Sequence, residues 1–169
     1  GTAGSGTKVE WQFDPASGSR LLAVGTIFSC TFKVTTKGTD GKVYFGPSAG
    51  ATSTATDLSL TNKHFGFKLT WAASANATLA ATQGNGTTET ASNLSTAIVV
   101  DDLITVIVKM VSATSADYYF QVNTGAMSSA TTLSTNFPAD TVWDLEFGAN
   151  NANVASNSVV SFCGASLQR

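Results

Sequence analysis

The sequence predicts an all-β protein built as an antiparallel two-sheet sandwich. In the segment His64–Gln121, short apolar stretches alternate with turns rich in Gly, Asn, Ser and Thr and with little charge. In His64–Trp71, large apolar residues occupy every second position, so one strand face is buried and the other faces water. No segment has the apolar spacing of a helix of ordinary length. Charged residues make up 12% of the chain, against roughly 25% in an average globular protein, so hydroxyl and amide groups are expected to cover the surface.

The first third of the chain is expected to hold four short strands, at Trp11–Phe13, Leu21–Val24, Ile27–Thr35 and Val43–Phe45. The last two strands are expected to form a hairpin, because Asp40 and Gly41 between them favour the positive φ angles of a tight turn. Ser48–Ser59 is a low-complexity segment and predicts a loop.

Six further strands are expected, at His64–Trp71, Ala77–Thr82, Ile104–Val111, Asp117–Asn123, Val142–Phe147 and Val159–Cys163. Asn85 and Gly86 predict a hairpin turn. The segment at 104–111 is apolar on both faces, which predicts a central strand. The Asn-rich segment Ala149–Ser158 predicts a second protruding loop. Strands of this number and spacing are typical of a β-sandwich.

Length and charge limit the domain organisation and the partners. The 169 residues suffice for one domain with a two-layer core. Residues 1–8 are expected to be a flexible arm or linker, and residues 9–169 a single β-sandwich domain. The net charge is −2 and the nine Lys and Arg are scattered, which argues against nucleic-acid binding. No apolar stretch approaches the roughly 20 residues of a membrane-spanning helix, so no membrane partner is expected.

Two cysteines permit one disulfide bridge. Cys30 and Cys163 lie in strand-like segments near opposite ends of the chain, so a bridge between them requires the first and last strands to be neighbours. The alternative is two buried thiols in a reduced core, because cysteine is among the most buried residue types. The sequence favours the buried thiols and leaves the bridge open.

Six segments of the C-terminal two thirds carry a family resemblance, namely HFGFKLTW, ATLAATQGNGTTET, LITVIVKM, DYYFQVNTG, NFPAD and VWDLEFGANN. They resemble the concanavalin A-like, laminin-G-like jelly-roll domains of bacteriophage structural proteins, whose strand ending in an Asn-Gly turn has its counterpart at Phe120, Val122 and Asn123. The resemblance implies a jelly roll that serves as a virion component, such as a capsid decoration protein, a head fibre or a tail fibre. It implies a place on the particle surface, contacts with other virion proteins and assembly into a homo-oligomer.

No catalytic residue is predicted. Asp144 and Glu146 lie two apart on an expected strand and therefore share a face, as the paired carboxylates of a glycosidase can. The third carboxylate of the E-x-D-x-x-E pattern of jelly-roll glucanases is missing, so both residues are interpreted as solvated. Glu10 and Glu89 are isolated in the sequence. The chain is accordingly expected to be non-enzymatic.

No metal site and no other cofactor is predicted. Asp101 and Asp102 could join Asp117 or Asn123 around a calcium ion, but adjacent acids at the start of a strand are more often a solvated turn. His64 is the only histidine, and no second histidine or cysteine lies at ligand spacing. It is expected to be a half-buried residue at the start of a strand.

Glycan binding is the second functional hypothesis, since sugars bind to aromatic faces and to amides. Tyr119, Gln121 and Asn123 share one strand face, and Trp143 is expected on a nearby strand. The alternative is that these aromatic residues pack on a second layer or on another subunit. Three functions are therefore ranked. A non-enzymatic virion structural protein that acts through subunit contacts and host-surface attachment comes first, a carbohydrate-binding module for surface polysaccharide second, and a jelly-roll glycanase third.

Overall fold

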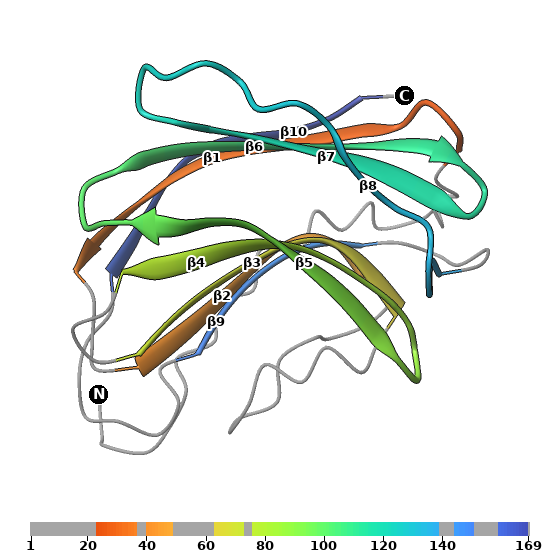
Figure 1. Ribbon diagram of the computed structural model, residues 1–169, viewed down its shortest axis with the longest axis horizontal. Helices are drawn as coiled ribbons and strands as arrows, with labels where there is room; N and C mark the ends of the chain where they lie inside the picture. The colour runs from red at the N-terminus through yellow and green to blue at the C-terminus, as the bar shows by residue number, and fades with distance from the viewer. Residues whose placement is uncertain are drawn as a thin grey trace.

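The structure is a sandwich of two five-stranded antiparallel sheets (Figure 1). It is a computed structural model that describes residues 23–36, 40–48, 63–72, 76–138, 144–150 and 159–168. The predicted all-β, two-sheet fold class is confirmed. None of the described residues forms a helix with the length and apolarity needed to cross a membrane. The expected arm at residues 1–8, the strand Trp11–Phe13 and most of both predicted loops lie outside the described residues.

One sheet, called here the β6 sheet after its central strand, has the strand order β10-β1-β6-β7-β8. Every neighbouring pair in it is antiparallel. The prediction of a central strand at 104–111 is confirmed, because this strand lies between β1 and β7. The members of the sheet are β1 (Ile27–Thr36), β6 (Leu103–Ser112), β7 (Ser115–Val122), β8 (Thr131–Leu133) and β10 (Val159–Gln168).

The other sheet, called the β3 sheet, has the strand order β5-β4-β3-β2-β9, again with antiparallel neighbours. Figure 1 shows that this sheet is bent, with the hollow side of the bend turned away from the β6 sheet. Its members are β2 (Asp40–Ser48), β3 (Lys63–Ala72), β4 (Ala77–Asn85), β5 (Glu89–Ile98) and β9 (Asp144–Asn150).

The core lies between the two sheets and follows the alternation seen in the sequence. The four large apolar residues of β3 are buried there, at Phe65, Phe67, Leu69 and Trp71. Aromatic rings join the sheets: Phe32 of β1 stacks on Phe45 of β2 with 3.9 Å between centroids. Phe67 meets Tyr118 of β7 edge to face at 5.5 Å. The pleat therefore turns the residues between them on β3, from His64 to Thr70, to the opposite face of the sheet.

The hairpin turn predicted at Asn85 and Gly86 is confirmed between β4 and β5. Gly86 has a φ of 94°, which a residue without a side chain adopts most easily. The Asn85 side-chain oxygen accepts hydrogen bonds from the backbone N–H groups of Thr87 and Thr88, at 3.0 and 2.9 Å. The turn fixes the register that brings the start of β5 beside the end of β4.

Two predicted features near the N-terminus are wrong. The first two described strands do not form a hairpin, since β1 belongs to the β6 sheet and β2 to the β3 sheet. Asp40 and Gly41 are the first residues of β2 rather than a turn with positive φ. The connection crosses from one layer to the other, a choice that turn residues cannot reveal. Of the expected strand Leu21–Val24, the described residues Ala23 and Val24 lie in a turn instead.

Two strands were not predicted. The strand β5 has the sequence ETASNLSTAI, which lacks strict alternation because it forms an edge of the β3 sheet and much of it is exposed. The strand β8 spans three residues and forms an edge of the β6 sheet. Both are edge strands, which the apolar pattern marks least clearly.

The two cysteines are both free thiols, although the strands that carry them are neighbours as a bridge would require. Cys30 of β1 is buried and pairs in register with Ala165 of β10. Cys163 is exposed, because β10 has a bulge there that shifts the register between Thr31 and Phe32. The favoured interpretation of two buried thiols therefore holds for Cys30 and is wrong for Cys163.

Candidate functional site

The outer face of the β3 sheet carries a cluster of polar side chains from three adjacent strands. Register pairing places His64 of β3, Gly84 of β4 and Glu89 of β5 in one row across the sheet. Thr82 lies two residues before Gly84 on β4, and Lys68 lies four residues after His64 on β3. Residues two or four apart on a strand share a face. The outer-face cluster is defined here as His64, Lys68, Thr82 and Glu89.

Hydrogen bonds join the four side chains into one chain that ends on the carboxylate of Glu89. His64 Nε2 lies 3.1 Å from Thr82 Oγ1. Thr82 Oγ1 donates to Glu89 Oε1 at 2.7 Å. Lys68 Nζ donates to the same oxygen at 2.5 Å and forms an ion pair with it. Charge-assisted bonds of this kind are shorter and stronger than neutral ones, so the position of the carboxylate is well defined.

The environment of Glu89 favours its ionised form. Burial alone would raise the pKa of this carboxyl, but the hydrogen bonds from Lys68 and Thr82 and the nearby positive charge outweigh burial and hold the pKa of Glu89 below its usual value. A carboxylate in this state accepts hydrogen bonds or takes up a proton, and it does not act as an acid at neutral pH.

The cluster is buried at one end and accessible at the other. His64 and Thr82 are fully buried, although they lie on the face turned away from the core. The side chains of Lys68 and Glu89 are 22% and 28% exposed to solvent. Among the described residues, both hydrogen bonds to the carboxylate go to Oε1 and none to Oε2. A molecule that approached this face would therefore meet the side chains of Lys68 and Glu89.

Tyr44 of β2 extends the face next to His64. Its hydroxyl donates to the backbone oxygens of Pro47 and Phe65, at 2.8 and 3.2 Å. The ring lies edge to face with the imidazole of His64, with 5.6 Å between centroids. It passes over Gly46, where an added Cβ would lie 3.0 Å from the tyrosine oxygen and closer still to the backbone of β3. A glycine is therefore needed at this place in the sheet.

Three of the four residues that the sequence singled out for glycan binding are described, and they lie elsewhere. Tyr119 pairs with Ile107 and Gln121 with Thr105, on the outer face of the β6 sheet. The amide of Gln121 donates to the backbone oxygen of Gly125 at 2.6 Å. Asn123 follows the end of β7, where its φ is 54°. Trp143 lies outside the described residues. Glycan binding by the four residues stays a prediction, and of these Tyr119 and Gln121 lie on the face opposite the cluster.

The turn around Asp102 is a hydrogen-bonded corner. The amide of Asn123 donates to Asp102 at 2.7 Å, while its oxygen accepts from the backbone N–H of Leu103 at 2.9 Å. Asp101 forms an ion pair with Lys33 at 2.9 Å. The described residues contain no group of three His, Cys, Asp or Glu that could hold a metal ion.

Two expectations about single residues need revision. His64 is fully buried rather than half-buried. The sequence could not assign Glu89 a partner. In the fold it has two, Lys68 of β3 and Thr82 of β4.

Asp144 and Glu146 belong to β9, where they pair in register with Ser48 and Gly46. Their side chains lie outside what the structure describes.

Lys68, Thr82 and Glu89 were not predicted to be members of a site. The sequence does contain one indication of Lys68. Charged residues are scarce in this chain, and Lys68 lies at an outward position of the most regular strand. A second indication is the Asn85-Gly86 turn, whose register could have placed Glu89 beside Gly84.

Comparisons with known proteins support the fold. No protein-family model and no curated protein matches the sequence. The chain is similar in structure to a xylan β-1,4-xylosidase from Bacillus halodurans C-125, with a TM-score of 0.60, 9% identity and coverage of 87% of this chain and 28% of that one. It is similar to an alginate lyase from Pseudomonas aeruginosa, with a TM-score of 0.58, 9% identity and coverage of 86% and 65%. A scytalido-glutamic peptidase has a TM-score of 0.56, 14% identity and coverage of 98% and 80%.

At these identities the matches show the fold alone. They place the chain among jelly-roll sandwiches of the concanavalin A-like class, which confirms that part of the resemblance. The expectation of a non-enzymatic protein is contradicted, because the xylosidase, the lyase and the peptidase that share this fold are enzymes. The chain spans about a quarter of the xylosidase and two thirds of the lyase.

Proposed function

We propose that the chain is a carbohydrate-active jelly-roll domain that receives a polysaccharide on the outer face of the β3 sheet. One observation carries the proposal: an ionised, partly accessible carboxylate is held beside a cation on the hollow side of that sheet, at the end of a buried hydrogen-bond chain. Partial burial of charged groups costs free energy, and ionisable residues with shifted pKa values gather at functional sites. The xylosidase and the alginate lyase act on polysaccharides, as their names state, which supports the choice of substrate class.

The two accessible side chains have complementary roles toward a sugar. Glu89 accepts hydrogen bonds from hydroxyl groups through Oε2, since Oε1 is already occupied. Lys68 carries three donor hydrogens and uses one of them for Glu89. The others suit a hydroxyl oxygen or the carboxylate of a uronic acid. His64 and Thr82 lie behind this pair and hold it in place.

Cleavage by elimination fits this arrangement better than hydrolysis. Glycosidases use two carboxyl groups about 5 to 10 Å apart. The strands β5 and β9, which carry Glu89 and the acids Asp144 and Glu146, form opposite edges of the β3 sheet. Four strand spacings correspond to about 19 Å. A single base beside a cation instead suits elimination at a uronate, with Lys68 against the uronate carboxylate and Glu89 taking the proton from C5. The C4–O bond then breaks as the C4–C5 double bond forms, and the departing oxygen takes a proton from water.

A setting on the surface of a virus particle, in a homo-oligomer that contacts other virion proteins, stays the prediction that the family resemblance makes. Such a setting is compatible with a polysaccharide-active domain, because a particle that attaches to a coated cell meets surface polysaccharide first. Light scattering of the purified chain tests the oligomer directly.

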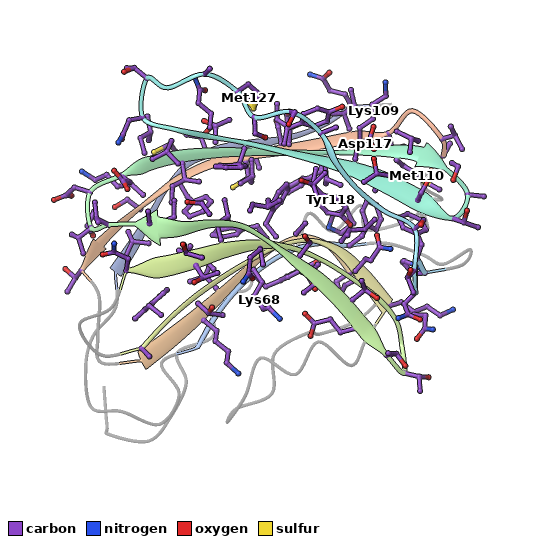
Figure 2. All side chains as sticks on the ribbon, viewed as in Figure 1. Lys68, Lys109, Met110, Asp117, Tyr118 and Met127 are labelled. Carbon is purple, nitrogen blue, oxygen red and sulfur yellow. The ribbon has the colours of Figure 1, made fainter. Side chains whose placement is uncertain are left out.

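The experiment is a panel of neutral and uronate-containing polysaccharides, examined for binding and for cleavage. Binding is followed by affinity electrophoresis, and cleavage by new reducing ends and by the ultraviolet absorbance of an unsaturated uronate. Glu89→Gln and Lys68→Met are the test variants. Lys109→Met and Asp117→Asn are matched controls, because these two residues pair in register on the outer face of the β6 sheet, opposite Lys68 (Figure 2).

We expect the test variants to weaken binding by about tenfold, the effect of one charged hydrogen bond, and the controls to change it less than twofold. Reducing ends without an unsaturated product would indicate hydrolysis and overturn elimination. If no polysaccharide binds, or if the control variants lose binding instead, the proposed site is wrong.

A further inference from the structure

The hydroxyl of Thr82 lies between the imidazole of His64 and the carboxylate of Glu89. This position determines which atom donates in each of the two hydrogen bonds. A threonine hydroxyl has one hydrogen to donate and two lone pairs to accept with. Thr82 Oγ1 lies 2.7 Å from Glu89 Oε1 and 3.1 Å from His64 Nε2. It can donate to one of these atoms only, and it must accept a hydrogen from the other.

Glu89 has to be the acceptor. Its Oε1 also receives Lys68 Nζ at 2.5 Å, and a carboxylate in contact with an ammonium group is ionised and has no proton to give. The lowered pKa of Glu89 agrees with this assignment. The hydrogen of Thr82 therefore points at Glu89, and the contact with His64 is a hydrogen bond only if Nε2 carries a proton.

We propose that Thr82 is a positioning residue that fixes the imidazole of His64 as the Nε2–H tautomer and so leaves Nδ1 as the basic nitrogen of the ring. The functional role of this residue rests on the proposed function, because the same hydroxyl of Thr82 donates to Oε1 of Glu89, the proposed sugar-binding carboxylate. The proton on Nε2 is inferred from the hydrogen bonds of Thr82 and the ionised state of Glu89, and it does not depend on the proposed function.

Gly84 supports the same ring from below. A Cβ added to Gly84 would lie 2.5 Å from His64 Cε1 and 2.9 Å from Nδ1, closer than such atoms approach in proteins. The imidazole therefore lies directly over the glycine, with Nε2 toward Thr82 and Nδ1 toward this position. Tyr44 holds the ring from the side of β2. Thr82, Gly84 and Tyr44 are thus among the neighbours that hold the ring in this orientation.

The test is a nitrogen NMR spectrum of the whole chain labelled with ¹⁵N-histidine. His64 is the only histidine, so two ring signals are expected without any assignment step. At a pH where the ring is neutral, we expect Nε2 at the pyrrole-like shift and Nδ1 at the pyridine-like shift. The reverse pattern, or two averaged shifts, would overturn the inference.

Two variants make the result specific to the hydroxyl. Thr82→Val keeps the shape and removes the hydrogen bond, so the preference for Nε2–H should fall by about fivefold, the effect of one hydrogen bond of about 1 kcal/mol. Thr82→Ser restores a hydroxyl at the same place and should restore the preference. If Thr82→Val leaves the spectrum unchanged while remaining folded, Thr82 does not position His64.

The spectrum separates this inference from the proposed function. The predicted tautomer in a chain that binds no polysaccharide would leave the inference standing and remove the function. Polysaccharide binding that depends on Glu89, in a chain with the opposite tautomer, would support the proposed function and overturn the inference about His64.

Discussion

Lys68 of β3 and Glu89 of β5 form an ion pair that passes over the intervening strand β4, with 2.5 Å between Nζ and Oε1. The pair links strands that share no backbone hydrogen bonds. It joins the start of β5 to the middle of the sheet and sets the position of two partly exposed charged groups on its outer face.

The first prediction concerns the pH dependence of stability. The folded state lowers the pKa of Glu89, so the stabilisation by this group is complete above the unfolded pKa of about 4.5 and is lost as the pH falls through the folded value. Glu89→Gln should therefore lower the free energy of unfolding at pH 7 by roughly 1 kcal/mol, a modest amount because the pair is partly exposed. Urea denaturation at pH 7 and at pH 3 measures the difference, which should shrink at the lower pH.

Lys68→Met supplies the control for that prediction. In its background, Glu89→Gln should cost less than in the natural chain, because the two residues interact directly. Equal costs in both backgrounds would show that the ion pair does not stabilise the sheet.

The second prediction concerns the glycine beneath the imidazole. Gly84→Ala places a methyl group against His64, so we expect a loss of about 1 to 3 kcal/mol in the free energy of unfolding from the forced shift. His64→Ala removes the ring that the methyl group meets. In that background Gly84→Ala should cost less, and thermal denaturation of the four variants measures the coupling. A cost that does not change would place the strain on the backbone of Thr88 instead, whose oxygen is 3.3 Å from the added atom.

The inner face of the β3 sheet could be predicted from the sequence, and its outer face could not. Alternation over one strand identifies Phe65 and Leu69 as buried, because burial follows from a pattern within a single segment. The outer-face cluster needs His64, Thr82 and Glu89 to come from three strands, up to 25 residues apart in the sequence. Strand order and register, not alternation, bring these residues together, and both depend on the whole fold.

The same distinction explains the error at the start of the chain. Asp40 and Gly41 are residues that turns favour, and locally they fit a hairpin. The chain instead moves to the other sheet, so that Phe32 of β1 and Phe45 of β2 face each other across the core. The burial of these two aromatic rings between the sheets outweighs the local preference of Asp40 and Gly41 for a hairpin turn.

The third prediction compares two adjacent tyrosines on β7. Tyr118 is buried between the sheets (Figure 2), and its hydroxyl lies 3.1 Å from Gln83 Oε1 and 3.3 Å from the backbone oxygen of Thr82. Tyr118→Phe leaves these buried acceptors without their donor, so we expect a loss of about 1 to 3 kcal/mol in the free energy of unfolding. Tyr119 is half-buried on the opposite face of the same strand. Tyr119→Phe should change stability by no more than about 0.5 kcal/mol, and urea denaturation compares the two.

The third prediction also tests how Gln83 is held. Its amide nitrogen donates to the backbone oxygen of Thr135 at 2.7 Å while its oxygen accepts from Tyr118. If Tyr118→Phe and Tyr119→Phe have the same small effect, the hydrogen bonds between the sheets contribute nothing measurable and packing alone positions β7.

The fourth prediction concerns the thiols. Burial, together with the nearby Cys163, raises the pKa of Cys30 to about 12, so this thiol stays protonated and unreactive in the folded chain. Cys163 is exposed on the bulge of β10. We expect a thiol reagent to modify one cysteine within minutes in the native protein and the second only when the chain unfolds. Mass spectrometry of the digested protein identifies the site, and Cys163→Ser should remove the fast reaction while leaving the slow one. Two unreactive cysteines that become reactive only after reduction would instead demonstrate a Cys30–Cys163 bridge, which would require the bulge in β10 to move.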